Sequence, residues 1–566
     1  MTEMSKMMRA GERVDTSVIS DLLDTEGEIT LIDQLLTEQR TLTAVERFSQ
    51  KHENATAPIQ SKYYQDLIPI RKPSTGEQYG FEVDLDKCTG CKACVVACHS
   101  LNGLKEEESW RDIGAIRGIA DGVAEQQTVT SACHHCLDPA CLSGCPVGAY
   151  EKMPDTGIVR HLDDQCIGCQ YCSLKCPYDV PKYDKNLGIV RKCDMCHERL
   201  AEGEAPACVQ SCPSGAISIQ LINVEEKKTE AMQGGSMIAG AFRSDYTLPT
   251  TNFRTKRKLT SGMESADEMD LTPAHGHSPL VWMLMLTQVA VGISVVDGLG
   301  RLFAPAHFES LSQVLTAIAV VLGNVGLGAS LLHLGSPLGA WRVFLGLKTS
   351  WLSREIVIFG AWMPALMLYA SLVWFPVYSK FLPSALPQEI PATATTASAM
   401  VAVILGILSV FCSIMVYVDT KRDFWTMRRT VGRFFGSMFL GGFSALLLTE
   451  GLIVGEISSI TGVAFLAALL FKIYVEASLL VPARNREWSF AKKSALIQLR
   501  SLRSSLTLRW ASFAAALVCG VASFYLPSLA LLVLPIVLSG EWLERRIFFQ
   551  AVVTLKMPGE LNQPSH

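Results

Sequence analysis

The chain has 566 residues, 49% of them hydrophobic, with a mean hydropathy of +0.25, which is high for a purely soluble protein and predicts two or more domains. Its formal net charge of -4 gives no reason to expect nucleic acid as a partner. Sixteen of the 18 cysteines lie between Cys88 and Cys212, a clustering that excludes the dispersed disulfides of a secreted protein.

The first 75 residues form a polar extension with helical periodicity at residues 32–36 and again at residues 42–48. Two interpretations stay open: a surface helix or tail, and an arm that docks a partner subunit. The first residues are polar, carry acids early and have no apolar stretch. They therefore predict neither a secretory signal nor a twin-arginine signal.

Residues 76–222 carry the clustered cysteines in four groups of four. The groups are Cys88-x2-Cys91-x2-Cys94-x3-Cys98, Cys133-x2-Cys136-x4-Cys141-x3-Cys145, Cys166-x2-Cys169-x2-Cys172-x3-Cys176 and Cys193-x2-Cys196-x11-Cys208-x3-Cys212. In two-cluster ferredoxins, the first three thiolates of such a run bind one cubane and the fourth binds the neighbouring one. The spacing predicts four [4Fe–4S] clusters in an α+β domain built as two ferredoxin-like pairs.

Structural zinc is the alternative explanation of clustered cysteines. Zinc takes four ligands in a tetrahedron, commonly from two separated C-x2-C pairs. It does not require the near-intact C-x2-C-x2-C-x3-C-P pattern that recurs along this segment, so iron–sulfur clusters are the preferred interpretation.

Residues 223–277 are charged and polar without a sustained apolar pattern and predict a tether, whereas residues 278–566 predict an all-α membrane bundle. Most of its apolar segments reach the length of about 20 residues that crosses hydrocarbon. The predicted spans, about eight, are residues 279–300, 311–333, 355–376, 398–418, 434–455, 457–480, 508–525 and 527–544.

Basic residues predict the orientation of the bundle. The second, fourth and sixth loops and the tail hold 18 lysines and arginines, whereas the opposite loops show only Arg301 and Lys380. Loops rich in Lys and Arg stay in the cytoplasm. We therefore expect an inner-membrane protein whose cysteine domain and C-terminal end both face the cytoplasm.

Histidines in the membrane part are few. After Cys212 they are His275, His277, His307, His333 and His566, and only His333 lies in or at the edge of a predicted span. A membrane b-type haem normally needs paired axial imidazoles on facing helices. The sequence therefore predicts a bundle without haem.

Other charges fall inside the predicted spans. Lys472 and Glu476 are four residues apart on one helix face, either as a neutralised pair that stabilises the bundle or as part of a proton path; the first is preferred. Glu450 and Glu541 lie near span ends, where we expect them to snorkel or cap.

The four cysteine groups, with x4 spacing in the second and x11 in the fourth, resemble the electron-transfer subunit of the dimethyl sulfoxide reductase family of iron–sulfur molybdoenzymes. Residues 333–342, 350–355, 420–425 and 540–545 resemble the haem-free membrane anchor subunit of the same family. The chain therefore resembles a fusion of two subunits that are usually separate.

The resemblance implies how the cysteines are shared, because that family pairs the first group with the fourth and the second with the third. Carried over, the four ligand sets are Cys88, Cys91, Cys94 and Cys212; Cys98, Cys193, Cys196 and Cys208; Cys133, Cys136, Cys141 and Cys176; and Cys145, Cys166, Cys169 and Cys172.

The resemblance also implies a quinol site, with menaquinol as the expected quinol, at His333 and Glu355. These residues end the second predicted span and begin the third, where an imidazole and a carboxylate can accept protons. The alternative for His333 is a helix-end histidine that is hydrogen-bonded to the backbone. Gly335 belongs to the same motif. Arg342 and Arg354 either bind a quinone oxygen, or anchor the loops by their charge or pair with Glu355.

Together these features predict that electrons pass from the quinone pool through four clusters to a separate catalytic subunit. The resemblance implies that this subunit carries a molybdenum or tungsten bis-pterin cofactor. Two alternatives stay open: the same complex running in reverse, from an oxidised substrate into quinone, and a membrane-tethered ferredoxin that serves several soluble acceptors.

Overall fold

The computed structural model describes residues 30–55, 60–106, 108–120, 123–257, 262–381 and 390–559. The chain divides into two compact units, Met1–Gln65 and Asp66–His566. The cysteine groups and the membrane helices thus belong to one unit.

The first unit contains the helices α3 (Leu31–Thr41), α4 (Ala44–Glu53) and the short α5 (Ser61–Tyr64). Capping boxes begin the first two, with Thr30 and Asp33 at α3 and Thr43 and Glu46 at α4. These helices confirm the periodicity in residues 32–36 and 42–48. Their apolar side chains are largely exposed, as at Leu31, Ile32, Leu35, Leu36 and Val45.

The cysteine-bearing region is an α+β fold, as predicted. One sheet has the strand order β8-β1-β9 and a second has the order β10-β2-β3, and two hairpins, β4–β5 and β6–β7, complete the strands of the described residues. The strands are β1 (Glu77–Asp84), β2 (Asp112–Ala120), β3 (Val123–Ser131), β4 (Tyr150–Lys152), β5 (Val159–His161), β6 (Lys182–Asp184), β7 (Ile189–Arg191), β8 (Ile217–Asn223), β9 (Asn252–Arg254) and β10 (Glu264–Ser265).

Short helices alternate with these strands and carry several of the cysteines. They are α6 (Ala93–Leu101), α7 (Ala140–Gly144), α8 (Tyr171–Lys175), α9 (His197–Ala201), α10 (Ala207–Gln210) and α11 (Val224–Met232). Strand β1 pairs antiparallel with β8, with Phe81 opposite Ile219. This pairing brings the first cysteine group beside the fourth, because β1 precedes the former and β8 follows the latter.

The segment 223–277, predicted as a tether, contributes secondary structure to the cysteine-bearing region. It contains α11, and β9 pairs parallel with β1 while β10 pairs antiparallel with β2. Strands of two and three residues are too short to produce an apolar alternation, which is why composition alone predicts an unstructured connection.

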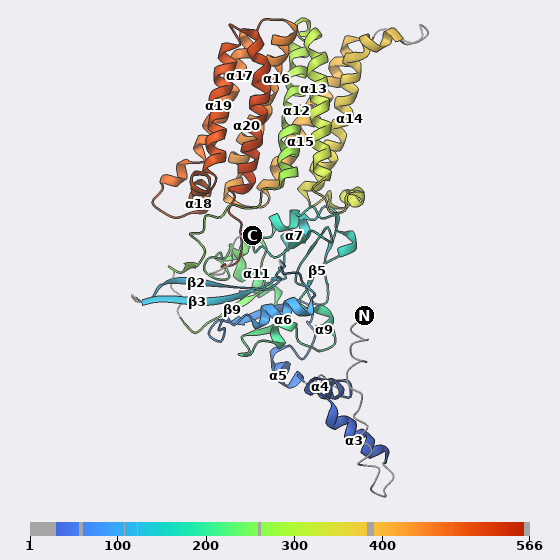
Figure 1. Cartoon of the computed structure of the whole chain (residues 1–566), viewed down its shortest axis with the longest axis vertical. Coiled ribbons are helices and arrows are strands. Elements are labelled where there is room, and N and C mark those ends of the chain that lie inside the picture. Colours follow the sequence, from blue (N-terminus) through green and yellow to red (C-terminus); the bar gives the residue numbers. More distant parts are fainter. Residues whose placement is uncertain are drawn as a thin grey trace, which may run out of the picture. The chain divides into compact units, whose positions relative to one another are not determined.

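Eight helices within the described residues are long and apolar enough to cross a membrane, as predicted. They are α12 (Ser278–Phe303), α13 (Pro305–Leu331), α14 (Trp351–Tyr378), α15 (Ala392–Val418), α16 (Met427–Ile453), α17 (Ser459–Ser478), α19 (Arg503–Ala522) and α20 (Ala530–Gln550), and Figure 1 shows them side by side. Helix α16 begins seven residues before the predicted span, because three arginines in its first turns mask the apolar pattern.

Helix α12 is the central span of this bundle. Its most apolar stretch is 83% buried, against 22% for α19 at the periphery. A Cβ on Gly292 would overlap the carbonyl oxygen of Met438, so glycine lets the backbones of α12 and α16 touch.

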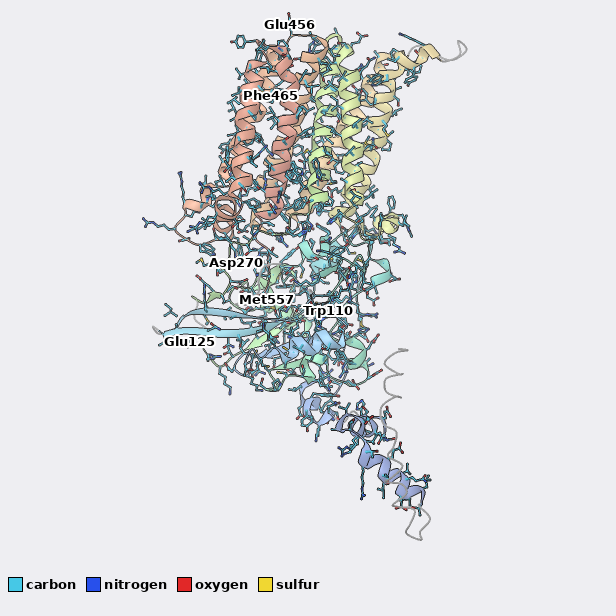
Figure 2. All side chains as sticks on the ribbon, in the orientation of Figure 1. Trp110, Glu125, Asp270, Glu456, Phe465 and Met557 are labelled. Atoms are coloured by element: carbon cyan, nitrogen blue, oxygen red, sulfur yellow. The ribbon has the colours of Figure 1, made fainter. Side chains whose placement is uncertain are left out.

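The bundle and the cysteine-bearing region are joined at the end where α13 finishes and α14 begins. The chain after α20 returns to the cysteine-bearing region, where the backbone N–H of Ala115 donates to Gly559 at 3.2 Å. Figure 2 accordingly places Met557 among the strands of that region and Glu456 at the remote end of the bundle.

Candidate functional site

Each cysteine group turns sharply at the residue before its second cysteine. These residues are Gly90, His135, Gly168 and Met195, with φ of 72°, 40°, 69° and 61°. The turn directs a backbone N–H toward the preceding sulfur, since Gly168 donates to Cys166 Sγ and Met195 to Cys193 Sγ, each at 3.4 Å. Left-handed backbone costs a non-glycine residue about 1–2 kcal/mol, so the shape is one that the sulfur site imposes.

We group the cysteines by the four ligand sets that the family resemblance implies. We call them thiol set 1 (Cys88, Cys91, Cys94, Cys212), set 2 (Cys98, Cys193, Cys196, Cys208), set 3 (Cys133, Cys136, Cys141, Cys176) and set 4 (Cys145, Cys166, Cys169, Cys172). Electrostatic interaction links Cys94 with Cys212, Cys98 with Cys196 and Cys208, Cys136 with the rest of set 3, and Cys172 with the rest of set 4.

The donor atoms fit iron–sulfur clusters. None of the sixteen cysteines forms a disulfide, and most are buried or half-buried. Burial, reinforced by the neighbouring Cys208, raises the pKa of Cys98 to about 12, and burial raises the pKa of Cys176 to about 11. Crowded thiolates of this kind need a cation among them, and a set of four cysteine sulfurs suits an iron–sulfur centre.

Backbone donors surround the sulfurs as well. The N–H groups of Ala149 and Ala216 donate to Cys145 Sγ and Cys212 Sγ, each at 3.2 Å. Hydrogen bonds to the sulfurs are one of the means by which a protein sets a cluster potential. Within the described part of the chain, no three His, Cys, Asp or Glu side chains converge as they would around a single metal ion.

The four sets follow one another in a row. Cys94 of set 1 interacts with Cys208 of set 2, Cys193 of set 2 with Cys133 of set 3, and Cys141 of set 3 with Cys172 of set 4. Lys192 lies between sets 2 and 3, with its Nζ 3.7 Å from Cys133 Sγ and 2.8 Å from the carbonyl oxygen of Cys193.

Set 4 is built into the surface of the membrane bundle. Its cysteines pack in one apolar cluster with Leu334, Val343, Ile356 and Val357 from the chain between α13 and α14 and from α14 itself. Ser336 N–H donates to Ile167 at 3.2 Å, Gly346 N–H to Pro146 at 3.1 Å, and the Ser350 hydroxyl to Gly144 at 2.7 Å. At the other end of the row, Cys91 of set 1 is exposed.

His333 lies against set 4. Its Nε2 is 3.2 Å from the carbonyl oxygen of Cys169, and its ring centroid is 5.6 Å from that of His277. Burial lowers the pKa of His333. The imidazole is therefore neutral at neutral pH and able to accept a proton.

Glu355 lies in the first turns of α14, is 4% exposed and accepts a hydrogen bond from Ser413 of α15. No hydrogen bond or ion pair of the described residues joins His333 to Glu355. The structure thus places both beside the cysteine-bearing region without direct contact between them.

Arg342 and Arg354, which were predicted for the quinol site, donate hydrogen bonds to backbone carbonyl groups. Arg342 Nη1 donates to Asp164 at 3.0 Å. Arg354 donates to Leu347 at 3.0 Å and Lys348 at 2.7 Å, and its guanidinium lies 4.3 Å from the Trp351 ring. This geometry corresponds to the loop-anchoring interpretation. Gly335 contacts the backbone of Gly188.

The structure also brings residues to this junction that the sequence did not single out. The Tyr171 hydroxyl, on α8, donates a hydrogen bond to the carbonyl oxygen of Val416 at 3.0 Å, and Lys175 forms an ion pair with Asp419 at 2.6 Å. Arg422 Nη2 donates to the carbonyl oxygen of Leu174 at 3.3 Å. Arg422 falls in the motif at residues 420–425. In sequence, however, a basic residue there is indistinguishable from other cytoplasmic loop cations.

Known protein families match the cysteine-bearing region and the membrane helices separately. Residues 79–100 match a 4Fe-4S binding domain, residues 124–222 a 4Fe-4S dicluster domain, and residues 274–550 the DMSO reductase anchor subunit (DmsC). The B subunit of the anaerobic dimethyl sulfoxide reductase of Escherichia coli (strain K12) is 43% identical over 180 residues, which cover 30% of this protein and 86% of that subunit. The chain belongs to the dimethyl sulfoxide reductase family.

Other relatives agree with this membership. The B subunit of the anaerobic dimethyl sulfoxide reductase of Haemophilus influenzae is 42% identical over 156 residues, covering 26% of this protein and 76% of that subunit. The iron–sulfur subunit of the nitrate-inducible formate dehydrogenase of Escherichia coli is 35% identical over 168 residues, but only 57% of its length is covered.

The chain is thus a dimethyl sulfoxide reductase family protein in which the iron–sulfur and anchor subunits are fused. Its cysteine motifs hold 4Fe–4S clusters, it passes through the membrane several times, and it is an electron-transfer subunit of an oxidoreductase complex. The resemblance inferred from the cysteine spacing and the anchor motifs is confirmed.

Proposed function

We propose that the chain oxidises a membrane quinol, with menaquinol as the expected one, and delivers the electrons through four [4Fe–4S] clusters to a separate catalytic subunit. That partner would carry a molybdenum or tungsten bis-pterin cofactor, as the likeness to the B subunit of dimethyl sulfoxide reductase suggests. Thiol sets 1 to 4 are the proposed cluster ligands, and when bound the clusters supply one-electron relays.

One observation carries this proposal: set 4 is held against the bundle, while set 1 reaches the surface at Cys91. A row of sulfur sites that starts at the membrane and ends at an exposed face suits electron transfer between a lipid-soluble donor and a docked protein. We therefore propose that electrons enter at set 4 and leave at set 1.

His333 and Glu355 are the proposed proton acceptors. Oxidation of a quinol releases two protons with its two electrons, and both groups lie at the edge of the bundle beside set 4. The neutral imidazole of His333 suits a base, and a buried carboxylate such as Glu355 in a membrane span is a functional candidate. Arg342 and Arg354 would act by holding the loop between α13 and α14.

The cysteine-bearing region is proposed to face the cytoplasm. It lies at the end of the bundle that carries most of the basic loop residues, whereas the opposite loops carry Arg301 and Lys380. Quinol protons would then be released on the side where the catalytic subunit takes up its own, so turnover would not move charge across the membrane.

Quinol-driven cluster reduction tests the proposal. In the complex under anaerobic conditions, a menaquinol analogue should reduce the clusters, followed by their EPR signals. His333→Gln should slow this reduction by about 10²-fold, the usual contribution of a general base, and leave dithionite reduction unchanged.

His307→Gln is the matched control. His307 lies at the opposite end of the bundle, where it pairs with Glu450 at 2.9 Å, so its loss should leave the rate at the wild-type value. A His333→Gln rate equal to wild type would contradict the assigned site. Clusters that accept electrons only from the catalytic side, and then reduce quinone, would show that the complex runs in reverse.

A further inference from the structure

A cavity of about 160 Å³ lies between the cysteine-bearing region and the bundle, and we call it the interface cavity. One wall is formed by Gln170 and Leu174, which flank Cys172 of thiol set 4 along α8. The other walls come from His275 and His277 before α12, from Arg422 and Trp425 between α15 and α16, and from Phe549 near the end of α20. A ligand here would lie one helix wall away from set 4.

Arg422 is the cation of this cavity. Its side chain is buried, with 4% of the residue exposed, and none of the ion pairs of the described residues includes it. Nη2 donates to Leu174 at 3.3 Å, whereas Nε is buried without a partner. Burial lowers the pKa of Arg422 to about 10, so the guanidinium stays charged at neutral pH with donors in reserve. The Asp179 carboxylate acts on Arg422 electrostatically but is not within ion-pair distance, so the buried Nε is left for a ligand to accept from.

His277 joins the cavity to the predicted quinol site. Its ring lies 5.6 Å from that of His333, 4.7 Å from that of His275 and 5.6 Å from that of Phe549. Burial, helped by repulsion from His333 and His275, lowers the pKa of His277 to about 3. The ring is therefore neutral and offers one donor and one acceptor. Its backbone is left-handed, with φ of 40°, a conformation that recurs at binding sites.

Aromatic side chains give the cavity flat, fixed walls. Trp425 stacks on Phe548 with ring centroids 5.2 Å apart, and its indole N–H donates to the Phe548 carbonyl at 3.2 Å. The Phe549 ring is nearly perpendicular to the Trp425 ring, with an interplanar angle of 83° and ring centroids 6.4 Å apart. Planar apolar walls with one cationic donor and one neutral imidazole suit a flat ring that bears two oxygens.

The same lining argues against a lipid phosphate. Asp179 also lines the cavity, and it is paired with Lys182 at 2.7 Å. A carboxylate and an uncharged imidazole beside a single arginine would bind an anionic phosphodiester poorly.

We propose that the interface cavity binds the quinol headgroup, with Arg422 and His277 hydrogen-bonded to its oxygens and Trp425 and Phe549 packed against its ring. This inference rests on the proposed function for the identity of the electron donor. It adds residues from three further segments of the chain to His333 and Glu355. It also explains why the quinol does not need Arg342 and Arg354, which donate to backbone carbonyl groups.

The test separates quinol binding from cluster integrity in the purified complex. Arg422→Met should raise the KM for a menaquinol analogue by about tenfold or more, the loss of one charge-assisted hydrogen bond, with kcat changed less. Iron content and dithionite reduction should stay at wild-type values. Arg422→Lys should recover part of the affinity. Arg428→Met, which removes an exposed cation six residues further along, should leave KM unchanged.

A second variant keeps the test decisive if Arg422→Met loses its clusters. His277→Asn removes the imidazole but tolerates the left-handed backbone, and it should raise KM several-fold. A wild-type KM in both variants would overturn the inference, as would an Arg422→Met complex that loses a bound phospholipid while keeping its quinol KM. A wild-type complex whose clusters no quinol reduces would instead overturn the proposed function.

Discussion

Three glycines meet where the loop after α13 crosses the cysteine-bearing region. A Cβ on Gly335 or on Gly168 would overlap the carbonyl oxygen of Gly188, and a Cβ on Gly168 would lie 2.9 Å from the backbone nitrogen of Gly335. The backbones are therefore in direct contact beside Cys169 and His333. The sequence motif placed Gly335 among the cofactor-binding residues, and the structure gives it a packing role at the same place.

Gly335→Ala should therefore loosen the junction between bundle and clusters. Overpacking of this kind costs about 1–3 kcal/mol, because backbone rather than a flexible side chain must shift. We expect a lower midpoint for thermal loss of the cluster absorbance and slower quinol-driven reduction. Gly360→Ala in α14, where nothing lies within 4 Å of the added carbon, is the control. Equal midpoints for both variants would contradict the close approach.

At the scale of single residues, the sequence was informative where a residue type carries the chemistry by itself. Cysteine spacing identified the cluster-binding region, and a lone histidine at a span edge singled out His333. Arg422 and His277 could not be found this way. Their meaning depends on burial and on neighbours more than 100 residues away, such as Leu174 for Arg422.

Among the elements, four helices of the bundle share a buried network of charges. Arg433 of α16 pairs with Glu544 of α20 at 2.6 Å, and Arg509 of α19 pairs with both Glu476 of α17 and Glu541 of α20 at 2.6 Å. Lys472 lies 3.2 Å from Glu541, and Arg545 lies 2.5 Å from Glu544.

This network extends and corrects the sequence-based interpretation of the charges. Lys472 and Glu476 are 3.7 Å apart, as their spacing suggested, but they belong to a set of four cations and three carboxylates. Glu541 was expected to snorkel or cap near a span end. It is instead fully buried, where Arg509 and the Ser437 hydroxyl donate to it. Glu450 is also fully buried, but it accepts the backbone N–H of Ser458 at the start of α17, which is the expected capping role.

The excess of cations predicts an asymmetry between variants. Glu541→Gln leaves four cations against two carboxylates and should destabilise the bundle by about 3–5 kcal/mol. Lys472→Met leaves three of each and should cost less. Glu456→Gln, at the exposed remote end (Figure 2), should have no effect. Detergent-unfolding midpoints measure all three, and a larger loss for Lys472→Met than for Glu541→Gln would refute the charge count.

Element boundaries were predictable where one pattern dominates. The eight spans follow from apolar length alone, and their ends differ from the prediction where charges are buried, as at Arg433 in α16. Arg433, Arg509 and Arg545 are buried in the network rather than loop cations, yet the remaining fifteen basic residues still far outnumber the two on the opposite side. The segment 223–277, predicted as a tether, also contributes β9 and β10, whose pairing with β1 and β2 could not be predicted from strands this short.

Over the whole second unit, the fused chain returns on itself. The segment 223–277 adds strands to the cysteine-bearing region, and the residues after α20 come back to it, where Lys556 pairs with Asp267. The cysteine-bearing region is thus joined both to the chain that precedes the membrane helices and to the chain that follows them. This arrangement fixes set 4 against the bundle in a way that two separate subunits would have to achieve by association.

The proposed relay requires sixteen thiolates that hold four iron cubanes in a row from the bundle to an exposed face. Iron and acid-labile sulfide measured per polypeptide, in complex purified without oxygen, test this most directly. We expect about sixteen of each, four per cluster, and very little zinc. Zinc in place of iron, or far fewer than sixteen irons in protein that retains its fold, would contradict the relay and the function proposed for it.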